Sequence, residues 1–465
     1  MALIALAFAF LSSAATFVNV SVPLSSSSAV TLSPSLVSFS IEQDRWPEWA
    51  GEATQNAFFY NALENLRQKT GEPPWIRIGA DSEDHTNFNA VTEVRTHVWW
   101  GVSLREDNLT SAYLETKAIV KAFTSAAVKN AGITLDFIEV GNEADMYVSN
   151  GGRVAPYGPK QYVPDRGIII HFVYKARRGI SQHLYSGSFC TGSGGLLQDL
   201  MTKATIRGNL TSLAPDIAAT QKHGLDYVLG ETNNYGCHGA PGVSNTAGAA
   251  LWALDYSLYA PQIGISRLFF HEGIGYKYNF IQPVSLNRSI IDGSALPTPL
   301  APHVQPAYYA AIIAADAIGS SGTTTSVELA INNAYLAGYA FYESGTLARV
   351  LLINSKAYLT TTNTPRGSLK VNLDFRGFGT TPKTMRIKRL TIGHADDTSG
   401  LTWGGQSYET GDALVSGHEN VPATTVTSGI TIFDTEVVLV QFLVPGSGRA
   451  LKQRSFSLKR GSNSG

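Results

Sequence analysis

The 465-residue sequence predicts an α/β protein in which a (β/α)8 barrel over residues 36–319 is followed by an antiparallel β-sandwich over residues 320–445. Three observations predict this. Strand-like apolar runs alternate with helical patterns up to about residue 319, as in parallel βαβ units. That stretch has the usual length of such a barrel, roughly 250 residues. Beyond it, short alternating runs lie between Gly, Asn, Thr and Pro turns, which is typical of a sandwich. No G-x-G-x-x-G follows the first strand, which argues against the alternative, a doubly wound dinucleotide-binding sheet.

The N-terminus resembles a secretory signal. Ala2–Leu11 is an uninterrupted apolar run followed by Ser12-Ser13-Ala14-Ala15, so we expect residues 1–15 to be a signal peptide. The run is too short to span a bilayer, and no other segment is long and apolar enough, so we expect no membrane span. A buried N-terminal strand is the alternative. We expect residues 16–35 to form strands that join the sandwich.

The barrel elements follow in order along the chain. The expected strands are Leu36–Ile41, Trp75–Ile78, His97–Val102, Leu135–Val140, Ile180–Tyr185, Leu225–Leu229 and Ile265–Phe270. The expected helices are Asn56–Lys69, Ser111–Lys129, Thr246–Tyr259 and Pro306–Ile318. The expected sandwich strands are Val327–Ile331, Ala337–Phe341, Ala348–Ile353, Leu369–Leu373, Thr384–Leu390 and Val437–Leu443. Residues 446–465 carry basic residues and no acid, which indicates a disordered basic tail.

The composition argues against some classes of protein and favours others. Only 15% of the residues are charged and the net charge is −1, which argues against a nucleic-acid-binding protein. Four sequons, at Asn19, Asn108, Asn209 and Asn287, agree with secretion to the extracellular space. The two cysteines, Cys190 and Cys237, predict one disulfide, with two buried thiols as the alternative. Neither lies in a CxxC, so we expect no metal site.

Two predicted strands run directly into glutamates. Leu135–Val140 is followed by Gly141-Asn142-Glu143, and Leu225–Leu229 by Gly230-Glu231. Barrel enzymes carry their catalytic groups at the C-terminal ends of the strands, and glycoside hydrolysis needs two carboxylates. Glu143 and Glu231 are therefore the candidate catalytic pair, and ordinary loop acids are the alternative. Glu272, which follows another strand beside His271, is a rival nucleophile.

The chain resembles glycoside hydrolase family 79, the β-glucuronidase and heparanase group, over most of residues 30–150 and 181–445. The motifs that carry the resemblance are Val140–Asp145, Gly230–Ser244 and Phe270–Asn279. It implies a retaining double displacement with Glu143 as general acid/base and Glu231 as nucleophile. It also suggests that Glu42, Asp84 and Asn142 bind sugar hydroxyls. The family's Gly-Gly-Asn-Ser pattern reads Gly79-Ala80-Asp81-Ser82 in this chain, so position 81 departs from it.

A glucuronide carries a carboxylate at C6, and the resemblance implies that Tyr276 and the Gly275 backbone bind it. Tyr185 and Tyr235 are further candidates from adjacent loops, with packing as the alternative. Lys277 could add a positive charge or be solvated. His183 and His238 lack a third ligand at metal spacing, so we expect structural or substrate-lining roles for them.

The resemblance implies a secreted, retaining exo-β-glucuronidase that needs no cofactor and binds a carbohydrate containing glucuronic acid. We expect a monomer. An endo-acting, heparanase-like enzyme is the nearest alternative. Residues 151–180 are too short for a complete βα unit, so either the coding sequence has lost an exon or the barrel lacks one unit. That shortening favours a further alternative, an inactive carbohydrate-binding or cell-surface protein.

Overall fold

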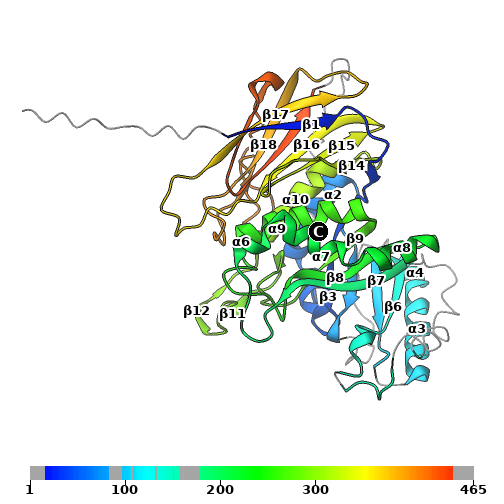
Figure 1. Cartoon of the computed structure of the whole chain (residues 1–465). Coiled ribbons are helices and arrows are strands. Elements are labelled where there is room, and N and C mark those ends of the chain that lie inside the picture. The colour runs from blue at the N-terminus through cyan, green and yellow to red at the C-terminus, as the bar shows by residue number, and fades with distance from the viewer. Residues whose placement is uncertain are drawn as a thin grey trace, which may run out of the picture.

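The computed structural model describes residues 16–82, 97–105, 108–130, 133–149, 151–157, 161 and 179–443. These residues form three layers (Figure 1). Antiparallel sheets lie at the top of the view, helices α2, α9 and α10 lie in the middle, and a curled parallel sheet lies below. The α/β arrangement with separate antiparallel sheets agrees with the prediction. The signal-peptide and tail predictions concern residues outside the described part.

The parallel sheet has seven strands, and strands far apart in sequence meet at its centre. In spatial order they are β6 (Thr134–Val140), β5 (His97–Val102), β4 (Ile76–Gly79), β3 (Val37–Glu42), β9 (Ile265–Glu272), β8 (Asp226–Gly236) and β7 (Gly179–Ser188). The first strand thus pairs with the last, as barrel closure requires. Among the described residues, β6 and β7 form the two ends of the sheet. The segment predicted to be too short for a complete βα unit connects them, and most of it lies outside the described residues.

Helices follow most of these strands. Their bounds are α1 (Trp46–Ala50), α2 (Ala57–Thr70), α3 (Leu109–Phe123), α4 (Ala126–Asn130), α6 (Leu197–Leu200), α7 (Lys203–Thr211), α8 (Ala214–Lys222), α9 (Ala247–Tyr259) and α10 (Ala307–Ile318). Local signals explain several ends. Asn56 caps α2 by accepting a hydrogen bond from the Phe59 amide, and Gly71 ends it in the left-handed conformation. None of the helices in the described part of the chain has the length and apolar character needed to cross a membrane.

The C-terminal half forms an eight-stranded sheet and a three-stranded sheet. The larger sheet contains β19 (Thr402–Trp403), β18 (Thr384–Thr391), β22 (Glu436–Phe442), β16 (Thr346–Asn354), β15 (Leu336–Glu343), β14 (Thr325–Glu328) and β2 (Val30–Thr31), with β20 (Ala423–Thr425) beside β18. The smaller contains β1 (Thr16–Pro23), β17 (Ser368–Arg376) and β21 (Ile430–Phe433). One pairing, β1 with β17, is parallel.

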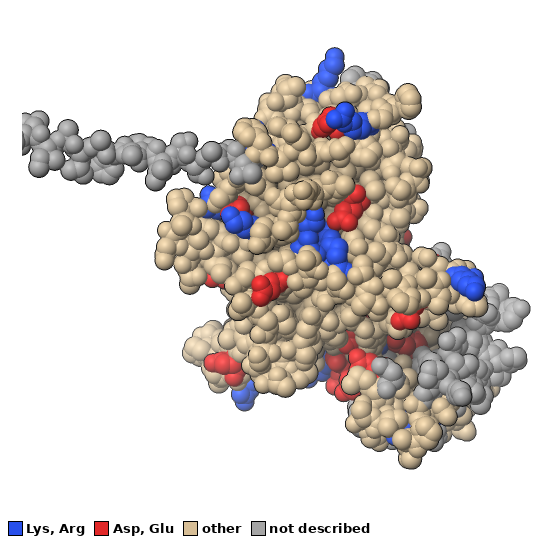
Figure 2. All heavy atoms as spheres, viewed as in Figure 1, with Lys and Arg blue, Asp and Glu red and all other residues tan. Residues whose placement is uncertain are grey.

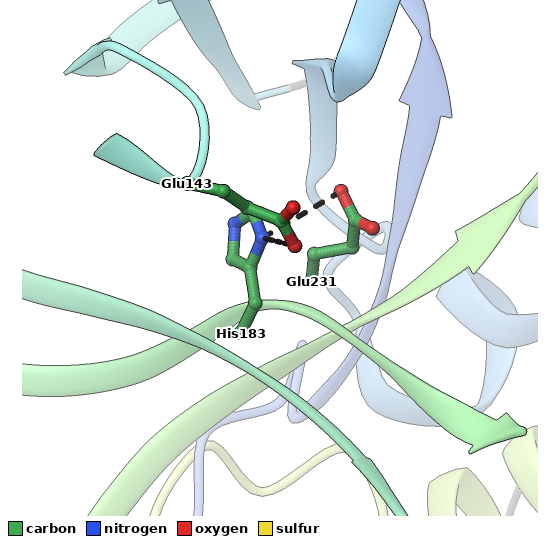
Figure 3. A group of neighbouring side chains, drawn as sticks. All are labelled: Glu143, His183 and Glu231. Carbon is green, nitrogen blue, oxygen red and sulfur yellow. Dashed lines mark hydrogen bonds and ion pairs between the residues drawn. The ribbon is translucent and has the colours of Figure 1, made fainter. Parts of the chain in front are cut away.

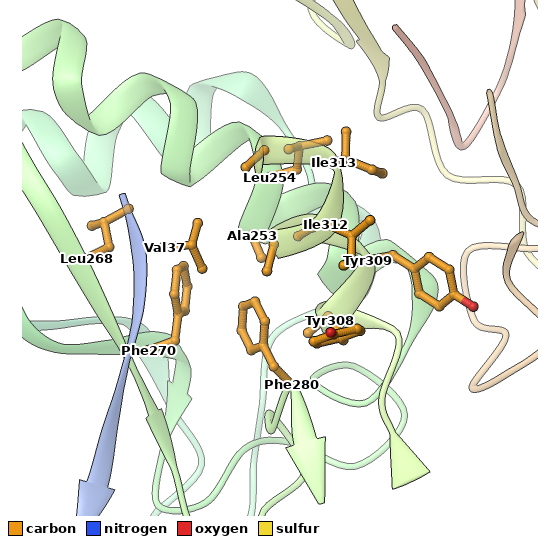
Figure 4. Close-up of a cluster of buried hydrophobic side chains, with 14 of the residues drawn as sticks. Val37, Ala253, Leu254, Leu268, Phe270, Phe280, Tyr308, Tyr309, Ile312 and Ile313 are labelled. Atoms are coloured by element: carbon orange, nitrogen blue, oxygen red, sulfur yellow. The ribbon is translucent and has the colours of Figure 1, made fainter. Parts of the chain in front are cut away.

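Two short ribbons complete the described strands: β10 (Ile281–Gln282) with β13 (His303–Val304), and β11 (Leu286–Arg288) with β12 (Ala295–Leu300). One hydrophobic core runs through the layers. Phe270 and Phe280 from the region of the parallel sheet pack toward α9 and α10, where Leu254 and Ile312 lie (Figure 4). The same cluster continues into the inner face of the larger antiparallel sheet.

Helices α9 and α10 are buried on nearly every side because they have neighbours both below and above. The outer surface visible in Figure 2 is mostly uncharged, with Lys, Arg, Asp and Glu in small scattered groups, as the low charge content predicts.

Candidate active site

The two predicted catalytic glutamates lie close together although they come from near the two ends of the open sheet. Glu231 is on β8 and Glu143 follows β6, and an oxygen of one lies within 4.8 Å of an oxygen of the other. His183 on β7 lies between them (Figure 3). Its Nδ1 is 3.2 Å from Glu143 Oε1 and 3.9 Å from Glu231 Oε2. The parallel strands thus bring both carboxylates to one edge of the sheet.

Arg77 connects this pair to the strands beneath it. Its side chain is fully buried on β4, and its guanidinium donates to Glu231 Oε2 at 2.9 Å and to Glu139 Oε2 at 2.5 Å. It also donates to Asn142 Oδ1 at 2.9 Å and to Ser40 Oγ at 2.8 Å. The fork of the guanidinium therefore fixes the positions of two acids and the amide that precedes Glu143.

Glu231 is held in its ionised form. Burial raises its pKa, but the charges of His271, His183 and Arg77 and a hydrogen bond from Tyr185 hold the pKa of Glu231 well below its usual range. The Tyr185 hydroxyl donates to Glu231 Oε1 at 2.7 Å. An ionised, oriented carboxylate beside a second carboxyl group can act as a nucleophile toward a sugar carbon.

His183 is the counter-ion at the centre of the site. Besides Glu143 and Glu231, Glu139 Oε1 lies 3.7 Å from its Nε2, so both ring nitrogens face carboxylates. Only the protonated ring can donate on both sides. Burial lowers the pKa of His183, but Glu231, Glu139 and Glu143 together raise it to about 9. His183 is therefore an imidazolium at neutral pH, and it crosslinks the two end strands through side chains.

The backbone at Glu143 is unusual. Glu143 has φ 45° and ψ 48°, two residues after Gly141 at φ 80°. A left-handed non-glycine residue costs about 1–2 kcal/mol and is often found at functional sites. Its side chain is 35% exposed, whereas that of Glu231 is 9% exposed. The more accessible carboxyl group is thus the one that can exchange protons with solvent.

Glu42, at the end of β3, is a second ionised acceptor in the site. It accepts hydrogen bonds from the Ser82 amide at 3.1 Å and the Ser82 hydroxyl at 2.6 Å, and His271 Nε2 lies 3.2 Å from its other oxygen. Burial raises the pKa of Glu42, but the hydrogen bond and charge of His271 outweigh it and lower that pKa. A carboxylate so placed suits a sugar hydroxyl donor, as predicted for this residue.

Four residues were predicted to bind the C6 carboxylate of the substrate, and only two of them lie next to side chains of the site. Tyr185 contacts Glu231, and Tyr276 lies beside His271, with ring centroids 5.8 Å apart. In contrast, the Gly275 amide already donates to Gln282 Oε1 at 2.8 Å. The Tyr235 ring lies against Gly187 and Gly195, and no described contact joins it to Glu231. Asp84 lies outside the described residues.

The rival nucleophile Glu272 is a structural residue in this geometry. It is fully buried and accepts hydrogen bonds from the Phe280 and Ile281 amides at 2.9–3.1 Å. Burial raises the pKa of Glu272 well above its ordinary value. A buried carboxyl group whose oxygens already accept hydrogen bonds from backbone amides is a poor nucleophile.

A disulfide joins Cys190, just after β7, to Cys237, just after β8, with the Cα atoms 5.1 Å apart. It connects the loops that follow the strands carrying His183 and Glu231. Glu143, His183 and Glu231 could together ligate an ion, although the sequence predicted no such group. The positive charges of Arg77 and His271 close to Glu231 oppose a further cation there.

Sequence reasoning missed Arg77 and Glu139 and undervalued His183. A usable signal was present: a charged side chain inside an apolar strand, as in Ile76-Arg77-Ile78, must face a polar interior or a site. The sequence also did not indicate the backbone conformation of Ala80. It occupies the second glycine position of the family's pattern and has φ 67°, a conformation that favours glycine.

The chain is similar to known glycoside hydrolases. Residues 338–439 match the glycosyl hydrolase family 79 C-terminal beta domain. A β-glucuronidase of Neurospora crassa is 25% identical, with 80% of this chain and 84% of the relative covered. A β-glucuronidase of Aspergillus niger is 26% identical, with 93% of each chain covered.

Solved structures share the fold. A 4-O-α-L-rhamnosyl-β-D-glucuronidase from Fusarium oxysporum superposes with a TM-score of 0.74 at 23% identity, covering 91% of this chain and all of that one. An α-L-arabinofuranosidase from Thermotoga maritima gives a TM-score of 0.59 at 11% identity, covering 92% of this chain and all of that one. The match to the C-terminal beta domain and the two fungal relatives confirm the predicted resemblance to glycoside hydrolase family 79.

Proposed function

We propose that this protein is a retaining exo-β-glucuronidase that removes terminal β-linked glucuronic acid from glycans or glycoconjugates. The observation that carries the mechanism is the pairing of Glu143 with Glu231, whose nearest oxygens lie within 4.8 Å. Retaining enzymes separate their carboxyl groups by about 5–5.5 Å, whereas inverting enzymes need about 6.5–9.5 Å to admit a water. The names of the two fungal relatives support the choice of glucuronide.

In this mechanism Glu231 attacks the anomeric carbon while Glu143 protonates the leaving oxygen, which gives a covalent glycosyl-enzyme. Glu143, now ionised, then takes a proton from a water that displaces Glu231. Arg77, Tyr185 and His183 hold the two carboxyl groups in place through both steps. The amide oxygen of Asn142 is held by Arg77, so its NH₂ group is left to bind a sugar hydroxyl.

We further propose that the parallel sheet is part of a (β/α)8 barrel. The pairing of β3 with β9 supports closure on one side. On the other side, His183 and Glu139 bring β7 and β6 within side-chain reach. The structural similarity to the Fusarium enzyme supports the same arrangement.

We also propose that the protein is secreted. The disulfide between Cys190 and Cys237 supports an oxidising compartment. Asn19, Asn108 and Asn287 are exposed in the structure, as glycan acceptors must be. The Asn209 Nδ2 atom, in contrast, is buried within α7, so the fourth sequon is a poor acceptor.

Hydrolysis of 4-nitrophenyl β-D-glucuronide tests the proposed activity. We expect turnover by the wild type and loss of at least about a thousandfold in Glu143→Gln and Glu231→Gln, because each removes one half of the carboxylate pair. Circular dichroism of both variants checks that the fold is kept. Turnover retained in Glu231→Gln would remove this residue as the nucleophile.

The same preparation can distinguish exo from endo cleavage. An exo enzyme releases monomeric glucuronic acid from the first minutes of digestion of a glucuronate-capped oligosaccharide. Early release of internal fragments from a uronic-acid polymer would instead support the endo-acting alternative.

A further inference from the structure

His238 lies beside the residue that is expected to bind the substrate carboxylate. It follows β8, is exposed, and stacks on Tyr276 with ring centroids 3.9 Å apart and ring planes at 14°. Tyr276 is itself held in place, because its ring fills the space that a Cβ atom on Gly273 would need. The two rings therefore form one wall, close enough to Glu42 and His271 for both charges to act on His238.

Three backbone amides near this wall already have acceptors. The Gly275 amide donates to Gln282 Oε1 at 2.8 Å, the Tyr276 amide to Gly273 O at 3.3 Å and the Lys277 amide to His238 O at 2.9 Å. A buried carboxylate without donors is costly, so the side chains of this wall are candidate donors. Within the described ranges, the Tyr276 hydroxyl and the His238 imidazole have no hydrogen-bond partner.

The backbone conformation at His238 is strained. Cys237 and His238 have φ values of 59° and 69°, and Gly239 follows at 84°. Two consecutive left-handed non-glycine residues are rare and persist only where the surroundings hold them. Here the disulfide to Cys190, the hydrogen bond from the Lys277 amide to His238 O and that from the Gly239 amide to Tyr235 O at 3.1 Å hold the segment. Strain of this kind is often found at ligand sites, and in this chain it presents the imidazole to Tyr276.

We propose that His238 is a specificity-determining residue whose ring N–H donates to the C6 carboxylate of the glucuronide, next to the Tyr276 hydroxyl. This inference rests on the proposed function. It identifies a second side chain that recognises the C6 carboxylate of the substrate. Burial and the charges of His271 and Lys277 lower the pKa of His238, so the ring acts as a neutral donor at neutral pH. Selectivity for glucuronides then depends on two stacked rings rather than on an unpaired cation.

A matched pair of substitutions, His238→Asn and His238→Asp, tests this role. Both side chains tolerate the left-handed conformation and have the same shape. Asn keeps an N–H donor, whereas Asp places a negative charge against the substrate carboxylate. We expect kcat/KM for 4-nitrophenyl β-D-glucuronide to be at least about tenfold lower in the Asp variant than in the Asn variant. The ratio should shrink at 0.5 M NaCl because salt screens the repulsion.

The control is the same pair at His223, an exposed residue at the C-terminal end of α8, where we expect no difference. If His238→Asp does not fold, His238→Gly relieves the strain and removes the ring, and its KM should rise about tenfold. Equal kinetics in the Asn and Asp variants, or an unchanged KM in His238→Gly, would overturn the inference while leaving the proposed function intact. A wild type without activity on the glucuronide would overturn both.

Discussion

At the residue scale, the site depends on one buried cation. Arg77 is inaccessible to solvent and bonds Glu139, Glu231 and Asn142 from a single guanidinium. A lysine would keep the charge but not the planar fork. We expect Arg77→Lys to lower kcat on the glucuronide by about a hundredfold and the free energy of unfolding by about 3 kcal/mol.

Steady-state kinetics and urea unfolding measure both quantities. Arg386→Lys is the matched control, because Arg386 is exposed on β18, and it should change neither. A kcat near that of the wild type in Arg77→Lys would mean that the position of Glu231 does not depend on the planar guanidinium of Arg77.

His183 makes stability depend on pH. Its pKa is about 9 in the folded protein and about 6.5 in the unfolded chain. Its stabilising contribution is therefore complete below pH 6.5. Between pH 6.5 and 9 the folded state binds more protons, so stability falls as pH rises, and above pH 9 the contribution is lost.

We expect the free energy of unfolding of the wild type, relative to that of His183→Gln, to fall by up to about 3 kcal/mol between pH 6 and pH 9.5. Urea titrations at a series of pH values give this difference directly, with the exposed His223→Gln as control. A difference that stays constant with pH would show that His183 is neutral in the folded protein.

At the element scale, the loops after β7 and β8 are joined covalently. The disulfide closes a loop with a sequence separation of 47 residues. In the chain-entropy model, a loop of that length contributes about 4 kcal/mol of stability. We expect Cys190→Ser/Cys237→Ser to lose a comparable amount in denaturant unfolding and to raise KM for the glucuronide, because the strained segment at His238 loses one of its constraints.

Each single Cys→Ser variant also lacks the disulfide and should therefore show the same losses as the double variant. An unchanged KM in the double variant would show that the hydrogen bonds of the His238 segment hold it without the disulfide.

The sequence predicted most elements of the parallel sheet because their strands are apolar, but it shortened β8. The prediction stopped at Leu229, whereas the strand continues to Gly236. Its last residues, Glu231 to Tyr235, are mostly polar. In the sequence, a polar run of this kind has the pattern of a loop. The helix expected over Ser111–Lys129 is interrupted after Phe123, where Thr124 bonds back to the backbone.

The site was predictable where a motif ended a strand, as at Glu143 and Glu231. Arg77 and Glu139 were not assigned roles, and His183 was expected only to be structural or substrate-lining, because the function of all three arises only when distant strands bring them together. The occupied amide of Gly275 was equally hidden, because its partner Gln282 is on the following ribbon.

At the scale of the whole molecule, a buried ion network joins the helical layer to the larger antiparallel sheet. Arg207 on α7 contacts Asp255 on α9 at 2.5 Å and Glu328 on β14 at 2.6 Å, and the Tyr339 hydroxyl on β15 bonds Asp255. We expect Arg207→Met to lower the free energy of unfolding by about 3–5 kcal/mol, since it leaves the buried carboxylate of Asp255 unpaired.

Differential scanning calorimetry measures this effect. We expect one cooperative transition in both proteins, because the hydrophobic core is continuous across the layers. Replacing both partners, as in Arg207→Met/Asp255→Leu, should recover part of the loss. Two separate transitions in Arg207→Met would instead show that the layers unfold independently.

In the proposed mechanism, Glu231 forms a covalent bond to a glucuronyl group. Treatment with 2-deoxy-2-fluoro-β-D-glucuronyl fluoride tests it most directly, because the fluorine slows hydrolysis of the intermediate more than its formation. Mass spectrometry of the protein and of its peptides should show one fluoroglucuronyl adduct, located on Glu231. An adduct on Glu272 or another residue, or efficient turnover of β-glucuronides with inversion and no adduct, would contradict the account.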